Sequence, residues 1–96
     1  MSPELVPITS AEQLVRHLLA WDCSADEIDR RLKDAPLWRH ATLPDARACG
    51  RLLRQRRRYD VALERTFKEG CAPTEEAIAE LLKVGVRTVD GWRHGR

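Results

Sequence analysis

Hydrophobic residues recur three and four positions apart in several stretches of the chain, and this spacing predicts an all-α protein. The first stretch covers residues 11–22, and either Thr9 or Ser10 is placed to cap it as part of a capping box. The apolar positions of this stretch are Leu14, Val15, Leu18 and Leu19, with Trp21 near its end. We therefore expect a first helix with one apolar face.

A second, narrower apolar stripe follows in residues 25–33, where Ser24 and Glu27 form another capping box. Residues 24–32 also faintly resemble residues 74–82 of the C-terminal segment described below, but Asp29 stands where that segment has the small residue Ala79, and no Thr-Val pair and Trp follow. A degenerate duplicate is therefore the less favoured alternative. Residues 34–44 are expected to be a loop. Leu37 and Trp38 within it either plug the core from the side or form an anchor for a partner protein.

A long helix is predicted from residue 45 to residue 69, with Pro44 in its first turn and Gly70 after its end. A bend is expected near residues 59–60, and Arg56 should lie near the apolar face and extend its head group to solvent. The residues on or beside the apolar face are Cys49, Leu52, Leu53, Tyr59, Val61, Leu63 and Phe67.

The last quarter of the chain predicts two short helices joined by a tight turn. Thr74 is a good N-cap for the first of them. The second begins at about Val86 and ends at Gly95, with Val89 and Trp92 expected in the core. A turn this short makes the two helices cross steeply, so a small residue is needed where they touch, and Ala79 is placed there.

This segment resembles the helix-turn-helix of phage repressor and Cro-type regulators. The resemblance covers about 22 of the 96 residues, and Lys83 and Gly85 depart from it, since the family usually has a turn Gly and a Ser or Thr cap there. The alternative is an ordinary helical hairpin. The matching positions are Thr74, Ala79, Leu82, Val84, Thr88, Val89, Trp92 and Gly95.

Charge divides the chain unevenly. Residues 1–43 hold five Lys or Arg against seven Asp or Glu, whereas residues 44–96 hold twelve against eight. We predict a single domain in which residues 1–10 are a flexible tail and residues 11–43 form a helical pair and loop that serves as a dimer or partner surface. Residues 44–96 carry the helix and the DNA-binding region.

Other classes of protein are disfavoured by the sequence. Cys23, Cys49 and Cys71 are far apart, so they are expected to be buried or inert thiols in a reducing cytoplasm and not metal ligands. No apolar run is long enough for a membrane span, and no signal-peptide pattern opens the chain. The histidines lie in separate segments, and no catalytic set is visible. We therefore predict a cytoplasmic protein that is not an enzyme and has no cofactor or metal.

The resemblance implies that the second helix of the motif enters the major groove of DNA. The predicted base contacts are Val86, Arg87, Thr88 and Asp90. Asp90 could instead orient a neighbouring arginine. The predicted phosphate contacts are Thr74, Lys83, Arg93, His94 and Arg96 of the motif together with Arg54, Arg57 and Arg58 of the long helix. For these last three arginines a solvated helix face is an equal alternative.

The predicted function is sequence-specific binding of double-stranded DNA by a small phage- or plasmid-type transcriptional regulator, a repressor, acting as a homodimer. The alternative is a protein-binding inhibitor or adaptor that uses the helix-turn-helix as a scaffold, with the partner held by the N-terminal helices or by Leu37 and Trp38. An accessory protein that bends DNA is a third option.

Overall fold

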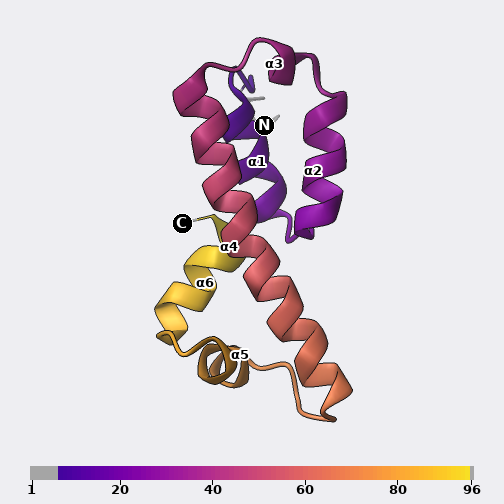
Figure 1. The fold of residues 1–96 in the computed structure, drawn as a ribbon, viewed down its shortest axis with the longest axis vertical. Helices are drawn as coiled ribbons and strands as arrows, with labels where there is room; N and C mark the ends of the chain where they lie inside the picture. The colour runs from indigo at the N-terminus through magenta and orange to yellow at the C-terminus, as the bar shows by residue number, and fades with distance from the viewer. Residues whose placement is uncertain (1–6, 96) are drawn as a thin grey trace, which may run out of the picture.

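The computed structural model describes residues 7–95, which form a small bundle of α-helices without a strand (Figure 1). This confirms the all-α prediction. The helices are α1 (Ala11–Ala20), α2 (Ala25–Asp34), α3 (Pro36–Arg39), α4 (Leu43–Lys68), α5 (Glu75–Leu82) and α6 (Val86–His94). We expected about five helices, and the additional one is α3. It forms inside the predicted loop because Pro36 suits the first turn of a helix.

Side-chain caps fix where four of these helices begin. The hydroxyls of Ser10, Ser24, Thr42 and Thr74 each accept a hydrogen bond from the backbone N–H three residues later. The cap at Thr42 explains why α4 starts at Leu43, slightly before the predicted start, with Pro44 still inside its first turn. The first helix ends at Ala20, two residues before the predicted end, because the backbone turns left-handed at Asp22.

Helix α4 is the long element against which the others pack (Figure 1). Its N-terminal half contacts α1 and α2, and its C-terminal half contacts α5 and α6. The helix is continuous through Gly50 and through the region where we expected a bend. Two acids on α4 also cap its neighbours, since Asp45 accepts from the N–H groups that open α1 and Asp60 accepts from the N–H of Ala25 in α2.

The hydrophobic interior is divided into two clusters. The N-terminal cluster consists of Ala11, Val15, Leu18, Leu19, Ala25, Ile28, Leu32, Cys49, Leu52 and Leu53, with Trp38 packed against it. The C-terminal cluster consists of Tyr59, Ala62, Ile78, Ala79 and Val89, with Leu63, Leu82 and Val84 packed against it. Trp38 therefore contributes to the core from the side, as the first of the two interpretations predicted, and Leu37 is half-buried.

Several residues that we assigned to apolar faces lie outside these clusters. Trp21 is 74% exposed, Val61 66% and Phe67 63%. Phe67 is still within α4, but it follows the buried Thr66 directly, so helical geometry turns it off the face that the helix buries. Trp92 is half-buried, so the prediction that it belongs to the core is wrong. Of the three cysteines only Cys49 is buried, where loss of solvation raises its thiol pKa to about 11, while Cys23 is half-buried and Cys71 is exposed.

The turn between α1 and α2 has a left-handed residue at its centre. Asp22 has φ 61°. Its N–H donates to the carbonyl of Leu19 at 2.9 Å, and the N–H of Cys23 donates to that of Leu18 at 3.1 Å. Two residues after Asp22, Ser24 caps the next helix. This is the Schellman arrangement, which satisfies the last carbonyls of a helix.

The turn between α5 and α6 repeats this pattern of hydrogen bonds. Lys83 has φ 57° and ψ 44°, as the resemblance requires at the position of its usual Gly. Its N–H donates to Glu80, and the N–H of Val84 donates to Ala79. Gly85 follows as the N-cap of α6, without a side-chain hydrogen bond. Figure 1 shows α5 nearly end-on with α6 rising across it, which is the steep crossing that we expected.

The two turns therefore correspond residue by residue, and the fourth residue of the following helix is fully buried in both units, as Ile28 in α2 and as Val89 in α6. Our sequence comparison placed residues 24–32 opposite the first helix of the motif. In the structure α2 follows its turn as α6 does, so by its backbone α2 corresponds to the second helix of the α5–α6 pair. The two helix pairs pack on the two halves of α4.

Candidate nucleic-acid interface

The first turn of α6 presents the predicted base-contacting side chains to solvent. Val89 is fully buried against the C-terminal cluster, and this fixes the rotation of the helix. Val86, Arg87 and Thr88 are consequently exposed, whereas Asp90 is half-buried. The N–H groups of a first helical turn carry partial positive charge that favours an anion nearby. An arginine, a hydroxyl and an apolar side chain thus stand together at an electropositive helix end.

The turn before α6 adds two of the predicted phosphate contacts. Lys83 is exposed at the left-handed position, and Thr74 is exposed at the start of α5. The Thr74 hydroxyl accepts from the N–H of Ala77, so its own proton is still available for donation. Both side chains lie at the ends of α5, and within residues 7–95 Lys83 forms no ion pair.

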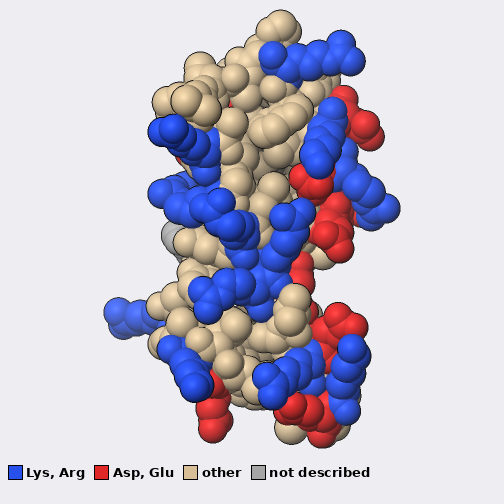
Figure 2. Space-filling model, in the orientation of Figure 1, with Lys and Arg blue, Asp and Glu red and all other residues tan. Residues whose placement is uncertain are grey.

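A row of exposed arginines follows one face of α4. Arg47, Arg51, Arg54 and Arg58 are spaced by four, three and four residues, which places all four side chains on the same face. Among residues 7–95 none of them forms an ion pair with a carboxylate. We call them the arginine stripe. In Figure 2 Lys and Arg side chains form a band along α4, whereas acidic side chains gather at the edge formed by α2 and at the lower end.

The arginine stripe continues into the exposed surface of α6. The guanidinium of Arg58 lies 4.7 Å from the centre of the Trp92 ring, which is a cation–π contact. A shallow depression between the two helices is lined by Gln55 of α4 and by Arg87, Thr88, Gly91 and Trp92 of α6. The half-buried indole of Trp92 therefore joins the stripe to the predicted base-reading residues.

Two of the predicted phosphate contacts are turned toward other parts of the protein. We expected Arg57 to lie close to Arg54 and Arg58, but its guanidinium faces α2, 3.9 Å from Asp26 and 3.8 Å from Asp29. Arg93 is bound to Asp22, with nitrogen–oxygen distances of 3.0 and 2.7 Å. Neither arrangement favours a phosphate contact by these two side chains.

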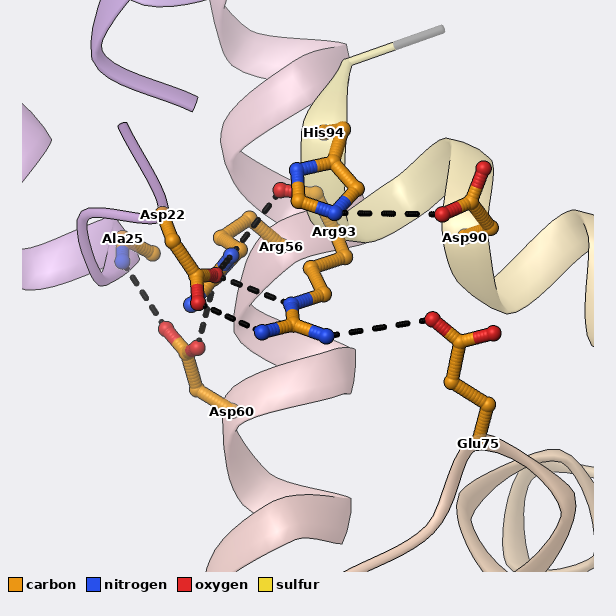
Figure 3. Close-up of polar contacts among 8 residues, drawn as sticks. All are labelled: Asp22, Ala25, Arg56, Asp60, Glu75, Asp90, Arg93 and His94. Carbon is orange, nitrogen blue, oxygen red and sulfur yellow. Dashed lines mark hydrogen bonds and ion pairs between the residues drawn. The ribbon is translucent and has the colours of Figure 1, made fainter. Parts of the chain in front are cut away.

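The remaining predicted contacts lie at the end of α6. His94 is half-buried with its Nε2 3.8 Å from a carboxylate oxygen of Asp90 (Figure 3). This contact lies within α6, one helical turn apart, and leaves both predicted roles of Asp90 as predictions. Arg96 lies outside the described residues.

Sequence reasoning missed a polar network that joins the two halves of the molecule (Figure 3). Its centre is Arg56, which is 4% exposed and does not extend to solvent as we predicted. The guanidinium donates to Asp60 and to Asp22, each at 2.8 Å, and to the backbone carbonyl of Arg93 at 2.9 Å. The guanidinium also lies 4.8 Å from the centre of the Tyr59 ring. Because these partners satisfy its donors, the side chain can remain buried.

Asp22 is the acid that the two arginines share. Its pKa lies well below the ordinary value for a carboxyl, first because Arg93 donates to it and also because Arg56 does, while partial burial acts in the opposite direction. The same hydrogen bond raises the pKa of Arg93 above its ordinary value. A second contact fixes the end of α6 to α1, since Arg16 donates to the carbonyl of Gly95. The network sets the orientation of α6 relative to α4 and thereby aligns the exposed surface described above.

The described residues contain no group of His, Cys, Asp and Glu side chains arranged to hold a metal ion. Within the same part of the chain, no helix has both the length and the apolar character that crossing a membrane requires. Comparison of the chain with protein-family models, with curated proteins and with solved structures found no match.

Proposed function

We propose that this protein binds double-stranded DNA in a sequence-specific manner, with α6 in the major groove, and acts in the cytoplasm as a small transcriptional regulator of the phage or plasmid type. The observation that carries the proposal is the continuity of one exposed basic surface. Arg87 and Thr88 of α6 line the depression together with Trp92, and Arg58 of the arginine stripe lies over the Trp92 ring. Val86 is exposed in the same first turn of α6.

Base reading is assigned to the first turn of α6. Arg87 is suited to donate to the O6 and N7 atoms of guanine, and Val86 is suited to contact a thymine methyl group. Thr88 has a hydroxyl for a base edge or a phosphate. Asp90, half-buried and next to His94, reaches less far than the other three and would accept from cytosine N4 only if the groove came close to α6.

Phosphate binding is assigned to side chains around that turn. Lys83 and Thr74 lie at the two ends of α5, and Arg54 and Arg58 lie on α4. Such contacts supply much of the affinity for DNA and make binding sensitive to salt. Since one small unit buries little surface, we propose that two copies bind half-sites about 34 Å apart, with the acidic α1–α2 side and the exposed Trp21 between them.

The first test is selection of bound sequences from a random duplex pool, followed by titration of the selected duplex. Arg87→Ala should weaken the selected site by about ten- to a hundredfold, which corresponds to about 1–3 kcal/mol, and should affect random DNA much less. Arg30→Ala is the matched control, because Arg30 is also exposed but lies on α2. Failure of the wild-type protein to bind any duplex at low salt would contradict the proposal.

A second candidate function, binding of another protein, is favoured by a groove between α4 and α5. Its floor is apolar, with Val61, Ala62, Leu81 and Leu82, and Arg57, Arg58 and Arg65 line its edge. Because Trp38 packs against the N-terminal cluster, it is less suited than Val61 to anchor a partner. Val61→Ser separates the two functions, because a small neutral side chain removes the apolar anchor without placing an acid beside Arg57 and Arg58. It should leave DNA binding intact if the protein is a regulator, and it should abolish partner capture if the protein is an adaptor.

A further inference from the structure

We propose that Arg47 and Arg51, in the N-terminal half of the arginine stripe, bind the phosphates of DNA that flanks the sequence read by α6. The inference rests on the proposed function, and it extends the DNA-binding surface from the helix-turn-helix along α4 to the N-terminal half of that helix. One copy of the protein would then contact DNA over a longer distance than α6 alone can cover.

The length of the arginine stripe fits this role. From Arg47 to Arg58 the helix advances eleven residues, or about 16 Å at 1.5 Å per residue. Phosphates of one DNA strand follow each other every 3.4 Å along the helix axis, so the stripe spans roughly five of them. Its lower end, at Arg58, is already next to α6 through Trp92. Its other end, at Arg47, is about 16 Å further along α4 and is thus placed to meet DNA outside the bases that α6 reads.

The surface beside Arg47 and Arg51 allows a close approach. A shallow depression there is lined by the three arginines Arg47, Arg51 and Arg54 together with the small residues Pro44, Ala46, Ala48 and Gly50. With no large side chain among them, a phosphate backbone can come near α4 itself. The arginines then reach it from the same face.

Gly50 supports this interpretation. Glycine inside a helix costs about 1 kcal/mol relative to alanine, and the fold does not require it here. A Cβ atom added at Gly50 would have ordinary contact with the Arg54 guanidinium, at 3.8 Å, and would meet no backbone or core atom. Internal packing therefore gives no reason for the glycine, whereas an open surface for a ligand does.

Charge pairing separates the stripe from the other arginines of the molecule. On α2, Arg30 and Arg31 pair with Glu27, and near the end of α4 Arg65 pairs with Glu69. Arg47 and Arg51 have no carboxylate partner within residues 7–95. Their charge is therefore available to an external anion. A regular row on a straight helix suits the evenly spaced phosphates of a duplex better than the irregular backbone of a folded RNA.

The test compares two double variants on two duplexes. Arg47→Gln/Arg51→Gln removes the two positive charges of the N-terminal half of the arginine stripe, and we call it the upper-stripe variant. Arg30→Gln/Arg31→Gln removes two positive charges from α2 and is the control. One duplex carries the selected site with long flanks, and the other is truncated to the bases protected by α6. Affinity is measured from 0.1 to 1 M salt, and melting curves confirm that each variant is folded.

On the long duplex, loss of two phosphate contacts should reduce the slope of log affinity against log salt by about 1.8. With equal affinity at 1 M salt, this corresponds to roughly thirtyfold weaker binding at 0.15 M. The α2 variant should change neither quantity. On the truncated duplex the upper-stripe variant and the wild type should bind alike. A further variant, Gly50→Leu, should fold at least as stably as the wild type and bind the long duplex more weakly.

Two results would overturn the inference while leaving the proposed function in place. One is that the upper-stripe variant binds the long duplex with the same affinity, and the same slope of log affinity against log salt, as the wild type. The other is an equal loss on both duplexes and on a single-stranded RNA of the same length, which would mean general attraction of polyanions. If the wild-type protein binds no duplex at all, the proposed function itself has failed, and the inference fails with it.

Discussion

The α1–α2 unit and the α5–α6 unit have turns of the same backbone geometry, but the side chains at the two turns differ in charge and in their contacts. Both turns have a left-handed residue, the same two hydrogen bonds to the preceding helix, and a buried fourth residue in the helix that follows. In the first unit the left-handed residue is Asp22, which is held by Arg56 and Arg93. In the second it is Lys83, which is exposed.

The two second helices also differ in charge. The first turn of α2 contains Asp26 and Glu27, and the helix is capped by Ser24 and by Asp60 of α4. The first turn of α6 contains no acid, carries Arg87 and is capped only by Gly85. Acids at a helix start compensate the helix dipole and repel phosphate. The N-terminal end of α2 is therefore neutralised by groups of the protein itself and does not attract an external anion. The same turn can thus serve structure in one unit while leaving a surface open to a ligand in the other.

The largest expected effect comes from breaking the network that holds the first turn. Arg56→Met should destabilise the protein by about 3 kcal/mol, because it leaves Asp60 and Asp22 without their buried partner and removes a donor to the end of α6. The measurement is urea denaturation. Arg57→Met is the matched control and should cost less than about 1 kcal/mol, since Arg57 is exposed and its ion pairs are long. Equal stability of Arg56→Met and the wild type would contradict this account.

Glycine at the left-handed position should have opposite effects in the two turns. Lys83→Gly should stabilise the protein by about 1 kcal/mol, because glycine adopts this conformation without strain. Asp22→Gly gains the same relief but loses the hydrogen bonds to Arg56 and Arg93, so we expect a net loss of about 2 kcal/mol. Thermal melting of both variants measures the difference. Two changes of the same sign would show that the turns are equivalent after all.

The pH dependence of stability tests whether the ion pairs of Asp22 are the reason that Asp22→Gly and Lys83→Gly differ in their effect on stability. The pKa of Asp22 is lowered in the folded protein, so its pairing stabilises the fold at pH values above the ordinary carboxyl pKa of 3.8. That contribution should decline as the pH falls below about 4, where the unfolded chain takes up a proton first. Asp22→Asn should flatten this part of the curve, while Lys83→Gly should leave its shape unchanged. A parallel decline in Asp22→Asn would assign the acid sensitivity to another carboxyl.

The sequence predicted the helices of the two units and some of their buried residues, but it did not predict that the two turns have the same backbone geometry. Capping residues and apolar spacing located five of the helices, and the resemblance placed Ala79 and Val89 correctly in the interior. Those features depend on neighbours in the chain. The correspondence between the two turns was missed because it is a property of the backbone, and Asp22 and Lys83 have no chemical similarity.

The candidate interface was predictable to a similar degree. Exposure of Arg87 and Thr88 followed from the burial of Val89 by helical geometry alone. The arginine stripe could have been found from its spacing of four, three and four residues, had Arg47 been considered together with Arg51. The positions of Arg56 and Arg93 could not have been predicted from spacing, because their partner Asp22 is 34 residues away from Arg56 and 71 residues away from Arg93. Pairing over such separations depends on how the helices pack.

The smallest expected effect comes from exchanging the two N-caps. Ser24→Gly should destabilise and Gly85→Ser should stabilise, each by a few tenths of a kcal/mol, roughly the difference between serine and glycine at this position. Denaturation of the single variants and of the double exchange measures both signs, and the double variant should be close to the wild type because the caps are remote from each other. Gly85→Ser should also leave DNA affinity within about twofold, since a Ser or Thr cap is usual in the family that this segment resembles. If Gly85→Ser instead weakens DNA binding while stabilising the protein, the backbone N–H groups of α6 bind phosphate directly, and the side chains of its first turn have a smaller share in recognition than we propose.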